Sequence, residues 1–265
     1  AAVGYDIFLG GKGTNQSVAL AKAGADVFHI GAFGKRDEYY LREMREAGVN
    51  LNNIALLETE SGHAVVMVDN ETGENQIVLS GSANNKISKK QIESALSNAK
   101  TTDWALAQNE TSLVHEFLVS AKEKGLKICY SAAPFVAKQT ASLLPFTDLL
   151  VVNEGEANAL IKFINKDVLE LGLPHLIITL GSKGARYIGE EGDFFVSPFE
   201  VSPVDTTGAG DTFLGYLLAS LSKGMSMEQA MSYGSAAASL QITKQGALAA
   251  IPSLQEVETF IGENS

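Results

Sequence analysis

One stretch of the chain carries most of the structural information: Asp205-Thr206-Thr207-Gly208-Ala209-Gly210-Asp211-Thr212-Phe213. It follows an extended, proline-containing segment (199–204) and opens a predicted helix over 212–221. Gly208, Ala209 and Gly210 have almost no side chain, so a ligand can approach the backbone closely. The first N–H groups of a helix lack acceptors within it, and the helix dipole favours negative charge there. The stretch therefore predicts an anion hole suited to a phosphoryl group in transfer.

Asp211 lies at the mouth of this predicted anion hole. A bound phosphate would repel a carboxylate, so Asp211 is useful there if it faces an acceptor hydroxyl and takes its proton during attack. The alternative is structural, because an aspartate in the first turn stabilises a helix through the helix dipole.

Predicted strands and helices alternate on both sides of this stretch. Strands are expected over 27–30, 104–108, 127–130, 149–153 and 175–180, and helices over 15–23, 38–47, 89–99, 111–124, 154–163 and 227–243. The 175–180 segment has almost no polar face, as in a parallel strand covered by helices on both sides. Repeated βα units predict an α/β fold with a doubly wound, mostly parallel sheet flanked by helices. We expect a single domain over residues 1–265.

Two further strands are predicted over 63–69 and 76–80. They are joined by Asn70-Glu71-Thr72-Gly73-Glu74, in which the asparagine and glycine favour a hairpin. This hairpin lies between a helix and the next αβ run, so we expect it to project from the main sheet. Residues 5–9 predict another short strand. Because the chain reaches a glycine-rich motif almost at once, we also expect a natural strand upstream of residue 1.

Composition limits the possible partners. The chain has 20 Lys plus Arg against 31 Asp plus Glu, a formal net charge of −11, which disfavours non-specific binding to nucleic acid. Any bound phosphate must then be held by backbone amides, a helix N-terminus or a metal. The single cysteine, Cys129, is expected in a buried strand and fits a reducing cytoplasm. No apolar run approaches the ~20 residues that span a bilayer, so no membrane partner is expected.

A second glycine-rich motif, Gly10-Gly11-Lys12-Gly13-Thr14-Asn15-Gln16, has neither Walker A nor G-x-G-x-x-G spacing. Alone, it is equally well explained as a turn in which Asn15 caps a helix. Together with the 205–213 stretch about 190 residues later, it closely resembles the ribokinase family of carbohydrate kinases. The resemblance covers the whole chain and extends to Gly73-Glu74-Asn75-Gln76, Ser80-Gly81-Ser82-Ala83-Asn84 and Gln241-Ile242-Thr243-Lys244-Gln245-Gly246-Ala247.

The resemblance implies an ATP-dependent sugar kinase in which Asp211 is the catalytic base and Gly208, Ala209 and Gly210 form the anion hole. The substrate-binding residues that it implies are Gly11, Lys12, Asn15, Glu110 and Asp211. For Glu110 the alternative is a surface glutamate at a helix start. The hairpin (about 62–81) and a strand over about 4–10 would form a small β-sheet lid that excludes water. Lid strands of two copies would meet in a homodimer.

The resemblance also implies where ATP and two cations bind. The implied nucleotide-binding residues are Asn153, Thr179, Leu180, Gly181, Ser182, Lys183, Gly184, Gly210 and Gly234. Glu156 would act on Mg²⁺ through water, although Asn153 and Glu156 also have the spacing of a helix capping box. An activating K⁺ would be bound, mostly through backbone carbonyls, at Asp205, Thr207, Gln241, Lys244, Gly246 and Ala250. Alanine at the last position lacks a hydroxyl that the family often has, and Gly234 cannot donate from a side chain to adenine.

The leading hypothesis for the reaction is conversion of D-ribose to D-ribose 5-phosphate with MgATP. The alternatives are a kinase for deoxyribose, another sugar or a nucleoside, and a non-catalytic sugar-binding paralogue. A dinucleotide-binding enzyme is disfavoured because no G-x-G-x-x-G follows the first strand. Three departures from the family pattern bear on this. The strand that carries a sugar-binding aspartate lies outside the numbering, the segment between Glu156 and Gly172 is short by about one helix, and Ser131-Ala132-Ala133-Pro134 replaces Asn-Pro-Ala-Pro.

Overall fold

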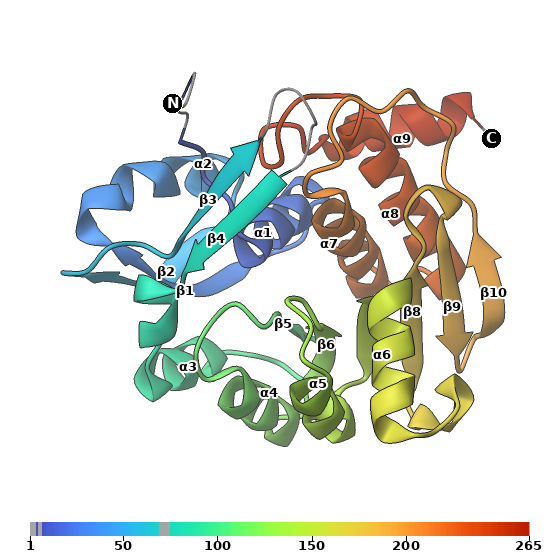
Figure 1. The fold of residues 1–265 in the computed structure, drawn as a ribbon, viewed down its shortest axis with the longest axis horizontal. Helices are drawn as coiled ribbons and strands as arrows, with labels where there is room; N and C mark the ends of the chain where they lie inside the picture. The colour runs from blue at the N-terminus through green and yellow to red at the C-terminus, as the bar shows by residue number, and fades with distance from the viewer. Residues whose placement is uncertain (1–3, 5–6, 69–74, 265) are drawn as a thin grey trace.

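The computed structural model describes residues 4, 7–68 and 75–264, and its centre is a six-stranded sheet (Figure 1). The strand order is β10-β9-β8-β7-β6-β5, with β5 to β8 parallel and β9 and β10 antiparallel. The strands are β5 (Trp104–Ala107), β6 (Lys127–Ser131), β7 (Leu149–Asn153), β8 (His175–Thr179), β9 (Ala185–Gly189) and β10 (Gly192–Val196). The predicted mostly parallel sheet is therefore confirmed.

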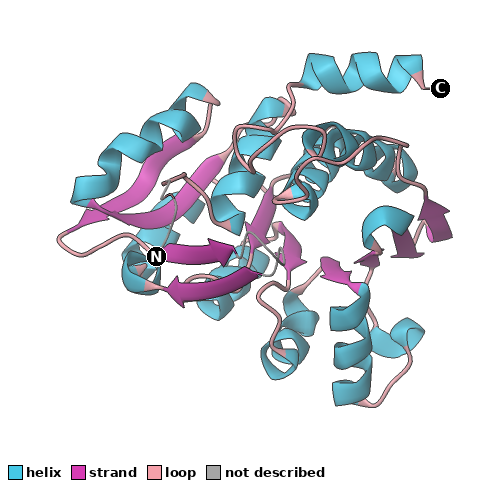
Figure 2. Ribbon diagram, turned by 45° about the horizontal axis from the view of Figure 1, so that its top comes forward, coloured by secondary structure: helices cyan, strands magenta, loops and turns pink. Residues whose placement is uncertain are grey.

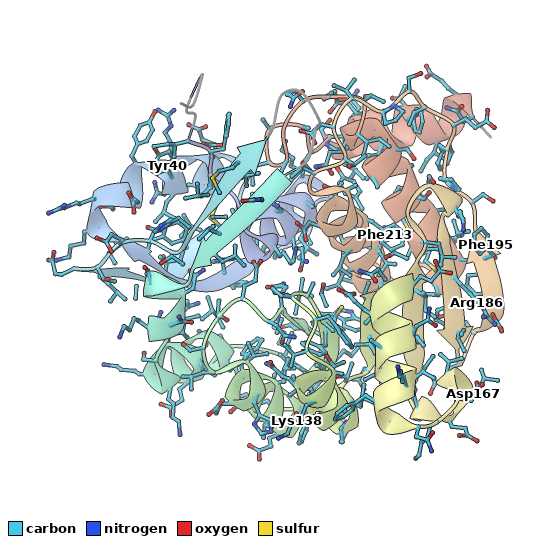
Figure 3. The ribbon with its side chains drawn as sticks, viewed as in Figure 1. Tyr40, Lys138, Asp167, Arg186, Phe195 and Phe213 are labelled. Atoms are coloured by element: carbon cyan, nitrogen blue, oxygen red, sulfur yellow. The ribbon has the colours of Figure 1, made fainter. Side chains whose placement is uncertain are left out.

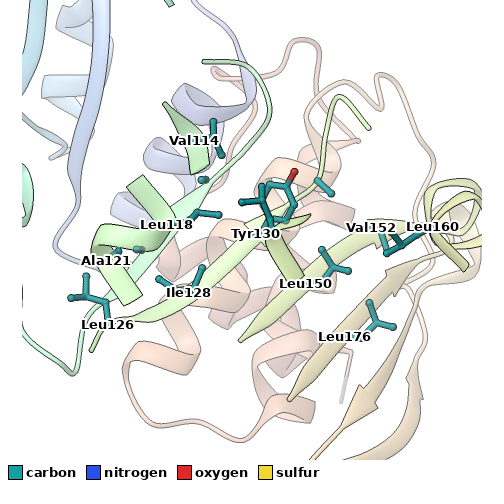
Figure 4. Close-up of a cluster of buried hydrophobic side chains, with 14 of the residues drawn as sticks. Val114, Leu118, Ala121, Leu126, Ile128, Tyr130, Leu150, Val152, Leu160 and Leu176 are labelled. Carbon is teal, nitrogen blue, oxygen red and sulfur yellow. The ribbon is translucent and has the colours of Figure 1, made fainter. Parts of the chain in front are cut away.

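Helices cover both faces of this sheet. One face packs against α3 (Lys89–Leu96), α4 (Val114–Glu123), α5 (Ala137–Leu143) and α6 (Glu154–Ile164). Ile128 and Leu118 belong to that core, which Figure 4 shows in close-up. The opposite face packs against α7 (Ala209–Ser222) and α8 (Met227–Gln241). Neighbouring residues of a strand point to opposite faces, so Cys129 lies in the second core, fully buried as predicted.

A further core joins α7 and α8 to the N-terminal and C-terminal parts of the chain. It contains α1 (Lys12–Lys22), α2 (Leu41–Glu46) and α9 (Leu254–Glu263), with Val18, Met44, Tyr216 and Val257 buried among them. A parallel pair, β1 (Phe28–Gly34) and β2 (Asn50–Leu57), forms its own two-stranded sheet. Short 3₁₀ segments are formed by Lys35–Tyr40, Ser82–Lys86, Leu144–Phe146, Val168–Leu171 and Gly181–Lys183. A cavity of about 2730 Å³ opens between β1, β5, the start of α1 and the hairpin.

The predicted hairpin is present as β3 (His63–Val68) and β4 (Asn75–Ser80), an antiparallel pair separate from the other sheets (Figure 2). Val65 pairs with Val78, and Ala64 pairs with Leu79. Because successive residues of a strand alternate between faces, these two pairs lie on opposite faces of the hairpin. Both faces expose apolar side chains, with Val78 57% and Leu79 66% exposed. The hairpin therefore contributes little to the main hydrophobic cores.

Several predicted elements are corrected by the structure. The lid strand expected over about 4–10 is not formed by residues 4 and 7–10, while residues 5 and 6 lie outside the described part of the chain. Among the described strands none pairs with 7–10, and a strand needs such a partner. The helix expected over 38–47 is split into a 3₁₀ segment followed by α2. Strands β2, β9 and β10 and helices α5 and α9 were not predicted, since β2 contains three asparagines and β9 ends at a glycine.

The distribution of charge agrees with an aqueous environment at the periphery. Lys138, Asp167 and Arg186 lie at the outer surface, whereas Phe213, a residue of α7, is buried in the interior (Figure 3). Across the described residues, the helices are too short or too polar for any of them to traverse a lipid bilayer.

Candidate active site

Gly208 is the residue that precedes helix α7, and its backbone conformation explains why a glycine is needed there. Its φ of 79° lies in the left-handed region, which residues with a Cβ adopt only at a cost. A Cβ at this position would also lie 3.0 Å from Nε2 of Gln241 and 3.1 Å from Cβ of Ala247. The chain can therefore turn into α7 at this point only with a glycine, which places the start of the helix against the 241–247 segment.

The start of α7 presents free backbone donors, as the sequence predicted. The amide of Thr212 donates to the carbonyl of Gly208 at 2.9 Å, the first regular hydrogen bond of the helix. The amide of Ala209 donates weakly, at 3.3 Å, to a carbonyl three residues earlier. Within the described residues, the N–H groups of Gly208, Gly210 and Asp211 donate to no protein acceptor. With the helix dipole, they form a site able to stabilise an anion.

Asp211 lies within this first turn and is held through both carboxylate oxygens. Nδ2 of Asn15 donates to Oδ2 at 3.0 Å, and Nε2 of Gln16 donates to Oδ1 at 2.8 Å. Burial raises the pKa of Asp211, and the two amide hydrogen bonds oppose that rise because they favour the ionised form. The site thus combines an anchored carboxylate with neighbouring free N–H groups.

Asn15 does not cap helix α1, so the structural alternative for the first glycine-rich motif is wrong. The helix begins at Lys12 after Gly11, and the amide of Asn15 already donates within the helix, to the carbonyl of Gly11. The Asn15 side chain is 6% exposed and turns toward Asp211. Its Oδ1 has no hydrogen-bond partner among the residues that the structure describes. A buried acceptor without a partner is costly, and a ligand hydroxyl would satisfy it.

Glu110 belongs to the same cluster rather than to the surface. Its Oε2 accepts a hydrogen bond from the backbone N–H of Lys12 at 2.9 Å. A Cβ added to Gly11 would lie 3.8 Å from that oxygen. Burial raises the pKa of Glu110, and the hydrogen bond from Lys12 opposes this. The alternative of a surface glutamate is therefore wrong, and the predicted substrate-binding residues all meet at the start of α1.

Part of this cluster lines the large cavity that the hairpin also borders. Its lining includes Gly11, Asn15, Glu110 and Thr207 on one side and Val66 of the hairpin on another. The cluster on α1, the end of β5 and the start of α7 are far apart in the sequence and adjacent in space, which Figure 1 shows for the elements themselves. A small polar ligand would fit between them.

Two further members of the cluster, Gln16 and Gln108, were not predicted. Gln16 is 1% exposed and bonds to Asp211, while Nε2 of Gln108 donates to Oε1 of Gln16. The available signal was an amide side chain directly after Asn15, and another directly after the apolar strand 104–107, two positions before Glu110.

Apart from Gly210 in α7 and Gly234 in α8, the residues predicted to bind nucleotide lie at or just after the carboxyl ends of two neighbouring parallel strands. Asn153 ends β7 and pairs in register with Thr179, which ends β8. The 3₁₀ segment that follows begins at Gly181 and is closed by Gly184, both with positive φ. Leu180, Ser182 and Lys183 belong to this turn. Among the described hydrogen bonds none connects this turn to the cluster around Asp211.

Glu156 and Asn153 form the helix capping box that their spacing in the sequence allowed. Oδ1 of Asn153 accepts from the N–H of Glu156 at 2.9 Å, and Oε2 of Glu156 accepts from the N–H of Asn153 at 2.8 Å. This reciprocal pair is a capping box at the start of α6. One carboxylate oxygen of Glu156 is thus committed to the helix cap, which leaves the other for water or a hydrated ion.

Gly234 has a different surrounding from the one predicted for a nucleotide contact. It is buried in α8, and a Cβ there would lie 2.6 Å from the carbonyl oxygen of Phe213. The absence of a side chain at this position allows α7 and α8 to pack closely. Gly234 therefore lies in the contact between these two helices.

Hydrogen bonds connect several of the residues predicted to bind K⁺. Asp205 accepts hydrogen bonds from the N–H groups of Thr207 and Gly246, both at 2.9 Å, and Nε2 of Gln241 donates to the carbonyl of Thr207 at 3.0 Å. The bond from Thr207 lowers the pKa of Asp205. The side chain of Lys244 pairs with Glu256, which does not involve its backbone carbonyl, and Ala250 is buried. The segments 205–207 and 241–246 are thus tied to each other.

No group of three or more His, Cys, Asp and Glu able to hold a metal occurs among the described residues. Mg²⁺ also accepts water and the phosphates of a ligand, so it does not need such a group.

Comparison with known proteins identifies the class of protein to which this chain belongs. Residues 4–254 match the family of pfkB carbohydrate kinases, and the chain belongs to that family. It is 32% identical to the ribokinase of Haemophilus influenzae over 272 residues, which covers 97% of this chain and 88% of the relative. It is 28% identical to the deoxyribokinase of Salmonella typhimurium, covering 99% of this chain and 90% of the relative.

The solved structures agree in fold. The structure of Arabidopsis thaliana ribokinase complexed with ribose and ATP superposes with a TM-score of 0.86 at 26% identity, covering 98% of this chain and 90% of the other. The family resemblance read from the two glycine-rich motifs is therefore confirmed.

Proposed function

We propose that this protein transfers the γ-phosphoryl group of ATP to the 5-hydroxyl of D-ribose. The observation that carries the proposal is Asp211, held through both oxygens next to the free N–H groups that open α7. A base beside an anion hole is what phosphoryl transfer to an alcohol requires. The ribokinase of Haemophilus influenzae and the ribose and ATP complex of the Arabidopsis enzyme support ribose and ATP as the ligands.

In this mechanism Asp211 accepts the proton of the attacking hydroxyl. The N–H groups of Gly208, Ala209 and Gly210 stabilise charge on the transferred group. Asn15 and Glu110 bind the sugar, because each offers an acceptor that a sugar hydroxyl can donate to. Gly11 and Lys12 complete the set of sugar-binding residues, and Gly11 allows the ligand to approach the backbone.

The nucleotide occupies the edge of the sheet formed by Asn153 and the turn 179–184, with Gly210 at the phosphate end. Mg²⁺ would neutralise charge on the phosphates, and the free oxygen of Glu156 would hold its water shell. K⁺ would be held by the 205–207 and 241–246 segments through carbonyl oxygens. The tie between these segments through Asp205 and Gln241 supports that position, since a cation there would order the start of α7.

The hairpin acts as the lid and as a dimer contact. Residues of both its faces are exposed, so one face can close over the cavity while the other meets the hairpin of a second copy. Covering these apolar side chains would also remove exposed hydrophobic surface from water. We place the enzyme in the cytoplasm, where ATP is available and the lone buried Cys129 stays reduced.

A coupled ADP-release assay over ribose, deoxyribose, other sugars and nucleosides tests the proposal, with K⁺ present or replaced by a large organic cation. We expect ribose to give the highest kcat/KM and K⁺ to raise it. A preference for deoxyribose would favour the second candidate, which the 28% identity to a deoxyribokinase supports. ADP release with none of the acceptors would contradict a kinase and revive a sugar-binding role.

A further inference from the structure

Two glutamine side chains connect the end of β5 to the carboxylate of Asp211. Nε2 of Gln108 donates to Oε1 of Gln16, and Nε2 of Gln16 donates to Oδ1 of Asp211 at 2.8 Å. Gln108 directly follows β5, Gln16 lies in the second turn of α1, and Asp211 lies in the first turn of α7. The series therefore ties three separate elements together at one carboxylate oxygen.

The direction of these hydrogen bonds is fixed by chemistry. A glutamine amide has a donor end and an acceptor end. Because Gln108 donates to the oxygen of Gln16, the nitrogen of Gln16 must face Asp211. An amide N–H pointing at Oδ1 favours the ionised carboxylate over the protonated one. Gln16 thus keeps that oxygen unprotonated and sets the rotation of the carboxylate.

Packing leaves Gln16 and Gln108 little freedom to adopt another arrangement. Gln16 is 1% exposed, and a Cβ on Gly13 would lie 3.2 Å from Oε1 of Gln108. Gln108 is thus pressed against the first turn of α1. A buried amide network with its main bonds satisfied rigidifies its surroundings, whereas a partly satisfied one is costly. The arrangement is therefore built to hold one geometry.

We propose that Gln108 and Gln16 act in series as positioning residues for the base, orienting Asp211 and keeping it ionised. This inference rests on the proposed function, in which Asp211 deprotonates the sugar. Both polar atoms of Gln16 are engaged by protein groups, its nitrogen by Asp211 and its oxygen by Gln108. Its role is therefore distinct from that of Asn15, whose Oδ1 remains open.

The test compares Gln16→Met, Gln108→Met and the double variant, since methionine keeps approximate volume but cannot hydrogen-bond in this way. For Gln16→Met we expect kcat to fall about tenfold to a hundredfold, as for a partial loss of general-base catalysis, with the KM for ribose nearly unchanged. The acid limb of kcat/KM should move to higher pH, because the ionised form loses a donor. Lys12 and Glu110, the charged groups that act on Asp211, stay in place.

For Gln108→Met we expect a smaller loss in the same direction. The double variant should match Gln16→Met alone, because Gln108 acts only through Gln16 and its effect cannot be added when Gln16 is gone. Gln108 is only partly buried and lies outside the helices, so its variant keeps the test usable if Gln16→Met does not fold.

Ser17→Ala is the matched control. Ser17 is the next residue of α1, is 8% exposed, and bonds to Nδ1 of His29 at 2.8 Å, away from Asp211. It should alter thermal stability without moving kcat or the acid limb. Wild-type kcat and acid limb in both glutamine variants, or additive losses in the double variant, would overturn the inference. If Asp211→Asn itself keeps full kcat, the proposed function fails instead, so the two failures can be told apart.

Discussion

The polar cluster around Asp211, called the floor below, and the hairpin, called the cover, are held by different forces. On the floor, Asp211, Asn15 and Gln16 are joined by hydrogen bonds between helices that are far apart in the sequence. The hairpin has its own ladder of hydrogen bonds but leaves Val78 and Leu79 more than half exposed. An element with few buried apolar contacts opens at low free-energy cost. The comparison supports the proposals that the floor is a preorganised active site and that the hairpin moves as its lid.

Asp211→Asn should break the chemistry of the floor most severely. We expect kcat to fall about a thousandfold, because the amide cannot accept the proton of the attacking hydroxyl. Ribose binding, measured by calorimetry, should change far less, since the other sugar contacts remain. A kcat near that of the wild type would show that the floor carries no base at this position.

Gly208→Ala should cause the next largest loss of kcat. Alanine at a φ of 79° is strained and would press on Gln241 and Ala247, which displaces the N–H groups at the start of α7. Loss of such donors lowers kcat by about a hundredfold or more.

Gly224→Ala is the matched control for this variant, at the other end of α7. Its φ is 82°, and a Cβ there would meet nothing within 4 Å. Both variants should lower the free energy of unfolding by about 1 kcal/mol through backbone strain, measured in urea. Only Gly208→Ala should also lose kcat, and equal kcat in the two variants would contradict the anion hole.

Leu79→Ser tests the cover. We expect the KM for ribose to rise about tenfold, because closure would bury less apolar surface, while the free energy of unfolding changes by less than about 0.5 kcal/mol. Sedimentation of the same variant reports whether the hairpin also joins two copies. Leu169→Ser is the control, since Leu169 is 68% exposed, close to the 66% of Leu79, and lies far along the chain on a 3₁₀ segment. An identical KM in both variants would remove the hairpin from substrate binding.

The smallest expected effect is on the pH profile. Burial raises the pKa of Asp211 above the ordinary aspartate value of 3.8. The base works ionised, so kcat/KM should fall on the acid side with an apparent pKa above 3.8. For stability the sign is the reverse of a salt-bridged carboxylate: a raised pKa in the folded state favours the protonated form, so ionised Asp211 opposes folding at neutral pH. An acid limb at or below 3.8 would contradict the burial of this group.

Much of the fold could be read from the sequence because the pattern is local. The apolar run 175–180 predicted β8 nearly residue for residue, and both strands of the hairpin were predicted, while the turn predicted over 70–74 lies outside the described residues. Strands β9 and β10 escaped prediction because Arg186, Asp193 and two glycines interrupt their apolar pattern. β10 is the edge strand and β9 is its neighbour. Arg186 and Asp193 pair with each other at the surface, so these polar residues need no burial.

The sequence by itself determined the class of protein and the chemical types at the site. A helix start that can bind an anion was predictable from Gly208 and the small residues after it alone, because backbone conformation and the helix dipole are local properties. The tertiary structure alone decided that Asn15 serves Asp211 rather than a helix cap, that Gln16 and Gln108 reach the same carboxylate, and that Gly234 packs two helices. These depend on residues up to 196 positions apart, whose meeting is set by the packing of the helices against the sheets.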